Sequence, residues 1–237
     1  RTGGAVFIED DAELIATGPE GRLSFRVGDL GIGSDAVVSA ALVEIAPFTV
    51  TPTRVPAEDQ IPGEFVILTD TLARLTFQTL RVGATTFDGV LTTTASTLLV
   101  DGPLAIPGTL DLRSLTTITQ SAGADLAVGT LTGESGGSTV LLNPGNTVAT
   151  LAGFAAGGDF RLLTQGPQLT VPGGTTVFAG GALGIEVSGG ALLVDGTVTG
   201  AETTLLAGTA LTVNGFSAIA RLGNLLMQAP SVTLAGL

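Results

Sequence analysis

Four short segments of nearly identical pattern recur in the last third of the chain, and they constrain the fold more than any other feature. Each segment alternates apolar residues with small or polar ones and ends in a glycine. They begin at Leu169, Leu192, Leu211 and Val232, which lie 23, 19 and 21 residues apart. Alternation with a period of two predicts a strand with one apolar face. Recurrence near twenty residues indicates a solenoid in which each repeat forms one coil.

The rest of the chain continues this rhythm in a weaker form. Residues 1–46 contain short alternating strands, and related segments begin at Leu104 and Leu126. No linker or change of composition separates a second domain. We therefore predict one all-β domain over residues 1–237, a parallel β-helix (β-solenoid) of about 20 residues per coil. The 35 glycines are expected to supply corners with positive φ between the strands.

Two segments depart from the pattern. Residues 46–64 contain four prolines, and because proline cannot donate a hydrogen bond to a strand ladder, we expect an excursion there rather than a central strand. Residues 69–75 begin with capping residues followed by good helix formers, which predicts a helix of one or two turns. Neither end of the chain carries a recognisable cap. The start at Arg1 and the stop within the rhythm at Leu237 favour a piece of a longer protein.

The residue types that are missing remove much of the usual catalytic chemistry. The sequence has no His, Cys, Trp, Tyr or Lys, and all nine of its cations are Arg. Without His or Cys, the usual zinc, haem and iron–sulfur sites cannot be built. The same absences rule out Ser-His and Cys-His nucleophile pairs and a lysine Schiff base. We expect no catalytic residues and no cofactor.

The net charge of −12 bears on the kind of partner. Nucleic acid is an unfavourable partner, because phosphate binding needs a basic stripe. An anionic membrane surface is disfavoured for the same reason. The sequence contains no apolar run of 18 residues, so no membrane span is expected. A cation-rich partner, or a neutral polar partner such as a glycan, remains compatible with the charge.

The densest acidic cluster lies near the start of the chain. If residues 9–13 form a strand, Glu9, Asp11 and Glu13 share one face of it. Three hard oxygen ligands on one face make a weak candidate site for Ca²⁺. The alternative is a solvated acidic patch without a metal ion.

Two other patterns suggest chemistry less directly. Residues 31–36, Gly-Ile-Gly-Ser-Asp-Ala, partly match a dinucleotide-binding fingerprint, but a strand rather than a helix is expected after them, which favours a turn. Glycosidic cleavage needs two carboxylates about 5–9 Å apart. Carboxylates that could stack on successive coils or sit at their turns are Asp101, Asp111, Asp125, Glu186, Asp195 and Glu202.

Several phrases resemble filamentous-haemagglutinin-like proteins of bacterial two-partner secretion. The most extensive covers residues 146–162, Asn-Thr-Val-Ala-Thr-Leu-Ala-Gly-Phe-Ala-Ala-Gly-Gly-Asp-Phe-Arg-Leu, and shorter ones cover residues 43–48, 68–75 and 79–83. The resemblance implies a right-handed parallel β-helix, export through an outer-membrane transporter and a surface filament used in adhesion. The family's N-terminal secretion domain is not recognisable, so the resemblance implies a shaft segment.

These observations lead to one functional prediction with two alternatives. We expect a non-enzymatic, structural and adhesive segment of a secreted protein on a bacterial cell surface. Its expected partners are other copies or adjacent coils stacked end to end, and host or surface glycans. The alternatives are a self-assembling extracellular fibre subunit and, less favoured, a polysaccharide-active β-helix enzyme.

Overall fold

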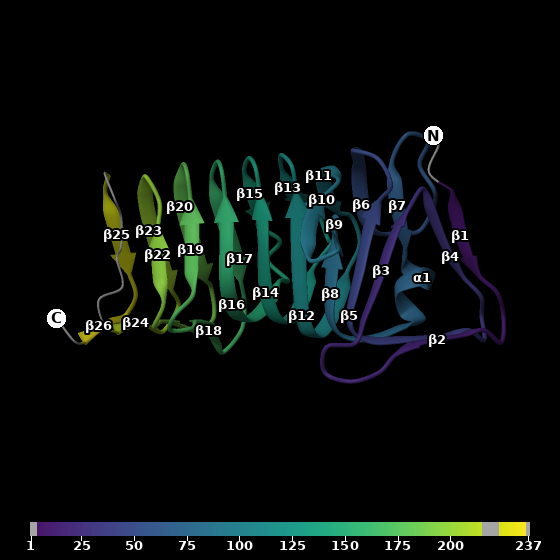
Figure 1. The fold of residues 1–237 in the computed structure, drawn as a ribbon. Helices are drawn as coiled ribbons and strands as arrows, with labels where there is room; N and C mark the ends of the chain where they lie inside the picture. The colour runs from purple at the N-terminus through teal and green to yellow at the C-terminus, as the bar shows by residue number, and fades with distance from the viewer. Residues whose placement is uncertain (1–3, 215–222, 236–237) are drawn as a thin grey trace.

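The computed structural model describes residues 4–214 and 223–235, and it forms a parallel β-solenoid of about 11 turns with about 21 residues per turn. Figure 1 shows the turns stacked side by side along one axis. The predicted fold class and repeat length are confirmed.

Two long sheets run the length of the stack, and every strand pairing within them is parallel. Sheet 1 contains β2 (Glu13–Ala16), β3 (Arg22–Val27), β5 (Val37–Pro47), β8 (Leu75–Val82), β12 (Leu104–Ser114), β14 (Leu126–Ser135), β16 (Thr147–Ala156), β18 (Gln168–Val171), β19 (Thr176–Ala179), β21 (Ala191–Val194), β22 (Thr197–Thr199), β24 (Ala210–Asn214) and β26 (Ser231–Ala235). Sheet 2 contains β7 (Phe65–Leu68), β6 (Thr51–Ala57), β11 (Ala95–Val100), β13 (Ile118–Gln120), β15 (Thr139–Leu141), β17 (Phe160–Thr164), β20 (Ala182–Val187), β23 (Glu202–Ala207) and β25 (Leu225–Gln228).

The four recurring segments are register partners on adjacent turns of sheet 1. Leu169 in β18 pairs with Leu192 in β21, which pairs with Leu211 in β24, which pairs with Val232 in β26. The three leucines are fully buried. Equivalent side chains therefore stack on one another in a single core that runs between the two sheets.

Close approach of the backbone, more than positive φ, explains the glycines at one corner of the turns. Gly136, Gly157 and Gly180 stand above one another, and a Cβ on any of them would lie 2.1–2.2 Å from the carbonyl oxygen of the preceding turn. None of the three has a positive φ, and only seven described glycines do. The expectation that glycine mainly supplies positive-φ corners is therefore wrong at this corner.

The proline-rich segment is a strand over residues 51–57, so the expected excursion is wrong there. β6 pairs with β11 on one side and β7 on the other. Pro52 lies at a register shift in the first pairing, and Pro56 lies at a register shift in the second. Irregularities of this kind let a strand accommodate residues that cannot donate a ladder hydrogen bond. Within this segment the chain leaves the strands at residues 48–50, between β5 and β6, and at residues 58–64, between β6 and β7.

The N-terminal end of the stack is covered, which the sequence did not indicate. The predicted helix is α1 (Thr69–Ala73), and it contacts β4 (Asp29–Ile32), β6 and β7. β1 (Ala5–Ile8) pairs with β4 in a separate two-stranded sheet. The buried hydroxyl of Thr71 donates to the carbonyl of Leu30. Figure 1 shows these elements at the end of the rod that bears the N-terminus.

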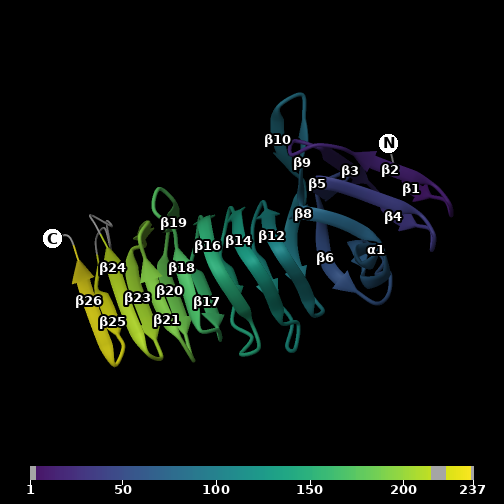
Figure 2. The same cartoon turned by 90° about the horizontal axis from the view of Figure 1, so that it is seen from below.

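One hairpin projects from the side of the rod (Figure 2). β9 (Ala84–Phe87) and β10 (Val90–Thr93) are antiparallel and joined through Asp88 and Gly89, with φ of 48° and 76°. Two consecutive positive φ values are typical of a type I′ turn, whose twist matches that of a hairpin.

Leu192→Ala should destabilise the rod far more than Leu193→Ala on the same strand. Leu192 is fully buried, whereas the side chain of Leu193 points to the other face and is partly exposed. Removing a buried leucine side chain costs about 2–5 kcal/mol, because the cavity adds to the lost burial. Urea unfolding followed by circular dichroism measures both variants, and equal losses of stability would contradict the assigned faces.

Candidate functional site

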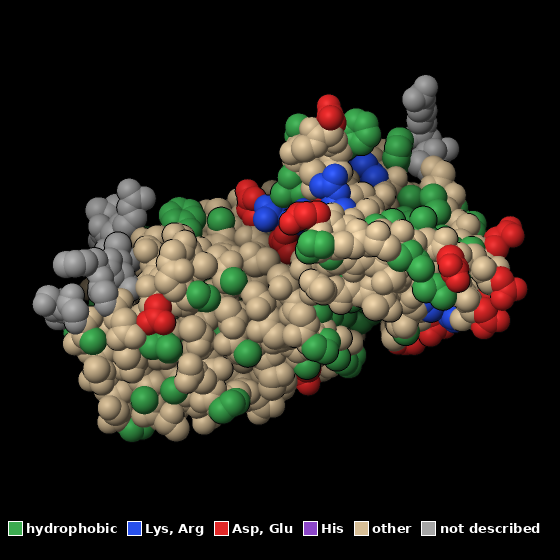
Figure 3. All heavy atoms as spheres, turned by 60° about the horizontal axis from the view of Figure 1, so that its bottom comes forward, with side chains coloured by type: hydrophobic (Ala, Val, Ile, Leu, Met, Phe, Trp, Pro, Cys, Tyr) green, Lys and Arg blue, Asp and Glu red, His purple; other side chains and the backbone are tan. Residues whose placement is uncertain are grey.

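A row of alternating charges crosses sheet 1 at the foot of the hairpin. The register aligns Glu44 in β5 with Arg81 in β8 and Asp111 in β12, and aligns Arg113 in β12 with Glu134 in β14. Arg81 binds the carboxylate of Glu44 and, at 2.6 Å, that of Asp111. Arg113 lies 3.0 Å from Asp111 and 2.7 Å from Glu134. Each inner member of the row therefore lies between charges of the opposite sign, and Figure 3 shows acidic and basic side chains gathered there.

Glu44 is the fully buried carboxylate at the β5 end of this row. It lies on the outer side of sheet 1 but is fully covered. Its carboxylate accepts hydrogen bonds from the hydroxyl of Ser24 in β3 and from the backbone N–H and hydroxyl of Thr86 in β9. Burial opposes ionisation, but the hydrogen bonds from Ser24 and Thr86 and the charge of Arg81 outweigh it and lower the pKa of Glu44. This carboxylate therefore ties the hairpin and β3 to the rod.

A second ion cluster lies on sheet 2. Arg54 in β6 donates to Glu64 at 2.8 Å and to Asp101 at 2.8 Å. Asp101 also accepts a hydrogen bond from the hydroxyl of Ser121. The bond from Ser121, followed by that from Arg54, lowers the pKa of Asp101. Its oxygens are therefore engaged in joining neighbouring turns.

Four of the carboxylates considered for a glycosidase pair are in contact with other groups of the fold. Asp101 and Asp111 are held by arginines in different sheets. The side chain of Asp195 accepts a hydrogen bond from Asn214 at 2.7 Å. The carboxylate of Asp125 packs directly against the backbone of Gly145. A Cβ added to Gly145 would lie only 2.1 Å from a carboxylate oxygen of Asp125.

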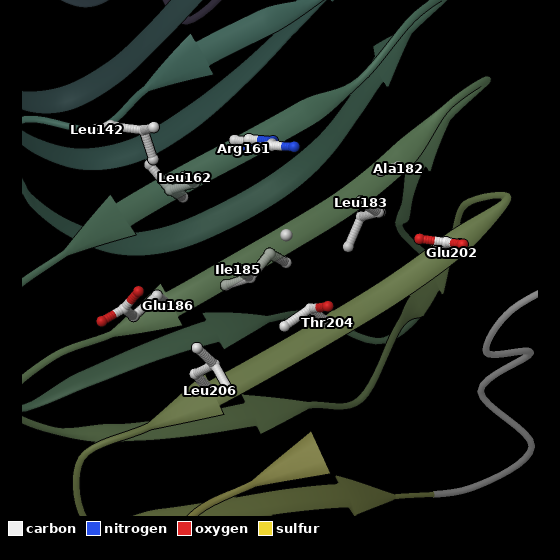
Figure 4. Close-up of a pocket in the computed structure, with 11 residues that line it drawn as sticks. Leu142, Arg161, Leu162, Ala182, Leu183, Ile185, Glu186, Glu202, Thr204 and Leu206 are labelled. Atoms are coloured by element: carbon white, nitrogen blue, oxygen red, sulfur yellow. The ribbon is translucent and has the colours of Figure 1, made fainter. Parts of the chain in front are cut away.

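Glu186 and Glu202 share a surface but lie far apart on it. Glu202 pairs with Ala182, so Glu186 lies four residues further along β20. Four strand residues span about 13 Å, which exceeds the separation of a glycosidase pair. Figure 4 shows the two carboxylates near opposite ends of the surface.

The acidic cluster near the N-terminus does not lie on a single strand, so the condition for a shared face of Glu9, Asp11 and Glu13 is not met. β1 ends before Glu9, Asp11 lies in a turn with φ of 63°, and β2 begins at Glu13. Asp10 occupies this turn and accepts hydrogen bonds from the backbone and hydroxyl of Ser34. Over the described residues, no group of three or more acidic side chains is placed to hold a metal ion.

The glycine-rich segment at residues 31–36 joins β4 to β5. The expected turn followed by a strand is confirmed, and the helix that a dinucleotide fingerprint requires does not follow it.

A shallow groove of about 390 Å³ lies on the outer face of sheet 2. Its strands are β17, β20 and β23, and its polar lining comes from Arg161, Glu186, Glu202 and Thr204. Leu142 and Leu206 add apolar walls (Figure 4). The sequence grouped the two glutamates as carboxylates that could stack on successive coils, but their grouping with Arg161 depends on the register between turns.

Comparisons with protein-family models, with curated proteins and with solved structures give no match. The fold therefore defines the class, a β-solenoid protein, and the resemblance to filamentous-haemagglutinin-like proteins stays a prediction from the sequence. Within the described ranges, no helix has the length and apolar character needed to cross a membrane.

Glu44→Gln should weaken the anchoring of the hairpin and remove part of the acid sensitivity of the rod. A carboxylate with a lowered folded pKa stabilises the fold above its unfolded pKa, and that contribution is lost as the pH falls below it. We expect a loss of about 1–3 kcal/mol at neutral pH and a shallower decline below the ordinary glutamate pKa of 4.5. Hydrogen exchange of the amides of β5 and β8, measured at several pH values, reports this local stability.

Glu134→Gln is the matched control. Glu134 belongs to the same row, but its side chain is 61% exposed, so its loss should cost less than about 1 kcal/mol. Equal effects of the two substitutions would show that burial of Glu44 does not matter for the network.

Proposed function

We propose that this chain is a non-catalytic, structural and adhesive segment, a β-helical shaft of a filamentous-haemagglutinin-like protein secreted to the bacterial cell surface. The observation that carries the proposal is the unbroken parallel pairing of both sheets from one end of the stack to the other. In such an array each turn contacts only its neighbours, so length can be varied without redesigning a site. About 11 turns at about 4.8 Å each give a rod of roughly 50 Å.

The arrangement of the polar residues supports a display role rather than catalysis. Of the six carboxylates considered for glycosidic cleavage, Asp101 and Asp111 hold neighbouring turns together. Glu186 and Glu202 are too far apart for the known carboxylate mechanisms. The hairpin, anchored by Glu44, projects from the rod as a lateral feature. A stiff rod with lateral features suits a filament that presents contact surfaces to other cells.

The charge supports glycans rather than nucleic acid or membrane as the partner. A net charge of −12 repels phosphate backbones and anionic lipid surfaces. Neutral sugars carry no such penalty.

Deletion of one whole coil tests the shaft function. Ala127 pairs with Thr147, so removing residues 127–146 should let the strands before and after the deletion pair in the same register. We expect the shortened chain to keep its strand signal per residue in circular dichroism. Beads coated with it should adhere to epithelial cells as well as beads coated with the full chain.

A half-coil deletion of residues 127–136 provides the matched control. It shifts the chain by half a turn, so strands of sheet 1 would have to pair with strands of sheet 2. It should lose both the strand signal and adhesion. Loss of folding or adhesion after the whole-coil deletion, or beads that never adhere, would refute the proposal.

Self-assembly into a fibre is the second candidate function, and a specific observation favours it. No described strand pairs with the outer edge of β25 or β26. These strands expose Leu225, Leu226, Val232 and Leu234. An edge strand with exposed apolar side chains is a template for pairing with another strand, and self-assembly requires that strand to come from a second copy.

Sedimentation velocity over a wide range of concentrations tests this candidate. End-to-end assembly predicts growing species that Leu225→Lys suppresses, because Leu225 pairs with the buried Thr203 on the inward face and a lysine there would be buried by stacking. Leu142→Lys, also at an exposed leucine but within the stack, should leave assembly unchanged. A monomer at every concentration would eliminate the fibre function.

A further inference from the structure

A glycine in the middle of β20 has no explanation within the fold. Gly184 pairs with Arg161 and with Thr204 in ladders that have no register shift, and its φ is not in the left-handed region. A Cβ at this position would meet only the Arg161 Cγ atom, at an ordinary 3.9 Å. Glycine inside a strand costs roughly 0.5–1 kcal/mol relative to alanine.

The other glycines within described strands each have a structural reason. A Cβ on Gly31, Gly108, Gly129 or Gly133 would come within 2.0–2.4 Å of a neighbouring atom. Gly153 has a φ of 86°. A strand glycine without a bulge, a bend or a close backbone neighbour is the kind found where a ligand approaches the sheet.

The missing side chain opens the groove on sheet 2. Arg161, Gly184 and Thr204 form one row across three adjacent turns. Arg161 and Thr204 are therefore separated by two strand spacings, about 9.6 Å, with only backbone between them. Figure 4 shows Arg161 and Thr204 on either side of this gap, with Glu186 and Glu202 towards its two ends.

The polar groups around the gap keep unused hydrogen-bonding capacity. Arg161 lies 3.9 Å from its nearest carboxylate, that of Asp159, which is too long for a hydrogen bond. Glu186 and Glu202 have no hydrogen-bond or ion-pair partner among the described residues. Three other arginines of the sheets behave differently, since Arg54, Arg81 and Arg113 each hold two carboxylates. Arg22 in β3 resembles Arg161, because it lies 4.0 Å from its nearest carboxylate.

The combination of these groups indicates the class of ligand. A guanidinium only donates, carboxylates only accept, and the Thr204 hydroxyl does both, so the ligand must carry several groups that both donate and accept. The ring hydroxyls of a sugar do this, and its C–H faces suit the apolar walls formed by Leu142 and Leu206. Two carboxylates against one arginine, in a chain of net charge −12, disfavour an acidic ligand.

We propose that the groove around Gly184 binds a neutral sugar residue of a glycan. Arg161 donates to the hydroxyl oxygens of this sugar residue on one side, and Thr204 contacts its other side. Glu186 and Glu202, about 13 Å apart along the strands, accept from hydroxyls of the glycan at the two ends of the groove. The inference rests on the adhesive part of the proposed function and gives that part a site and a ligand class.

Titration of the isotope-labelled chain with oligosaccharides tests the site. The probes are neutral hexasaccharides of glucose, galactose and N-acetylglucosamine, with a hexasaccharide of galacturonic acid as the acidic comparison. We expect at least one neutral probe to shift the amide signals of Gly184 and Thr204 and the side-chain N–H of Arg161. Gly184→Thr fills the gap with a residue that favours strands, so it should preserve folding and weaken binding at least tenfold; Arg161→Gln should weaken binding by a similar factor.

Gly189→Thr is the matched control, because Gly189 also has free space for a Cβ and a φ outside the left-handed region but does not line the groove. It should bind like the wild type. The inference is overturned if no neutral probe shifts these signals, if only the acidic probe does, or if Gly184→Thr binds normally. The two proposals can fail separately. If the sugar site is overturned but the coated beads still adhere to cells, the proposed adhesive function stands. If the chain binds sugar but its beads do not adhere, the adhesive function is refuted and the sugar site stands.

Discussion

The whole structure depends on the in-register stacking of each turn on the one before it. Leu169, Leu192 and Leu211 occupy the same inward position on successive turns and are all fully buried. Since every turn offers its neighbour the same apolar row and a complementary ladder of backbone groups, a narrow core can extend without large aromatic residues. The same repetition aligns outward side chains into rows, so the surface chemistry also follows from the register.

The outward rows are used in two different ways. Near the N-terminal end, the row of Glu44, Arg81 and Asp111 pairs its charges internally, and Glu44 also holds the hairpin. Further along the rod, the row of Arg161, Gly184 and Thr204 leaves its polar groups unpaired around a gap. The first row stabilises the scaffold, whereas the second leaves polar side chains exposed around a gap, and this gap is the basis of the glycan site that we propose.

The sequence predicted the features that one repeat contains and missed those that depend on distant turns. Alternation and a period near twenty were enough to predict the parallel solenoid. The helix formers at 69–75 predicted α1, but the expected side-chain cap is wrong, because the N-cap is Leu68 and no side chain caps the helix. The strand at 51–57 could not be predicted from its prolines, because both of them lie at register shifts defined by strands outside this segment. Gly184 looked like any other glycine until its neighbours on the adjacent turns were known, and the burial of Glu44 depends on β3 and the hairpin, which lie elsewhere in the sequence. The N-terminal cap is not periodic, so a search for repeats could not find it.

Engineered disulfides test the register most directly, because the natural sequence contains no cysteine. Thr170 pairs with Leu193 on the next turn, and Leu193 pairs with Thr212 on the turn after that. Adjacent parallel strands lie about 4.8 Å apart, within the Cα separation of a disulfide, whereas two turns place the Cα atoms about 9.6 Å apart, beyond its reach. The stacking predicts that a chain with Thr170→Cys and Leu193→Cys forms an intramolecular disulfide under mild oxidation and that one with Thr170→Cys and Thr212→Cys does not. Equal crosslinking of both pairs, or none in the first, would contradict the in-register solenoid.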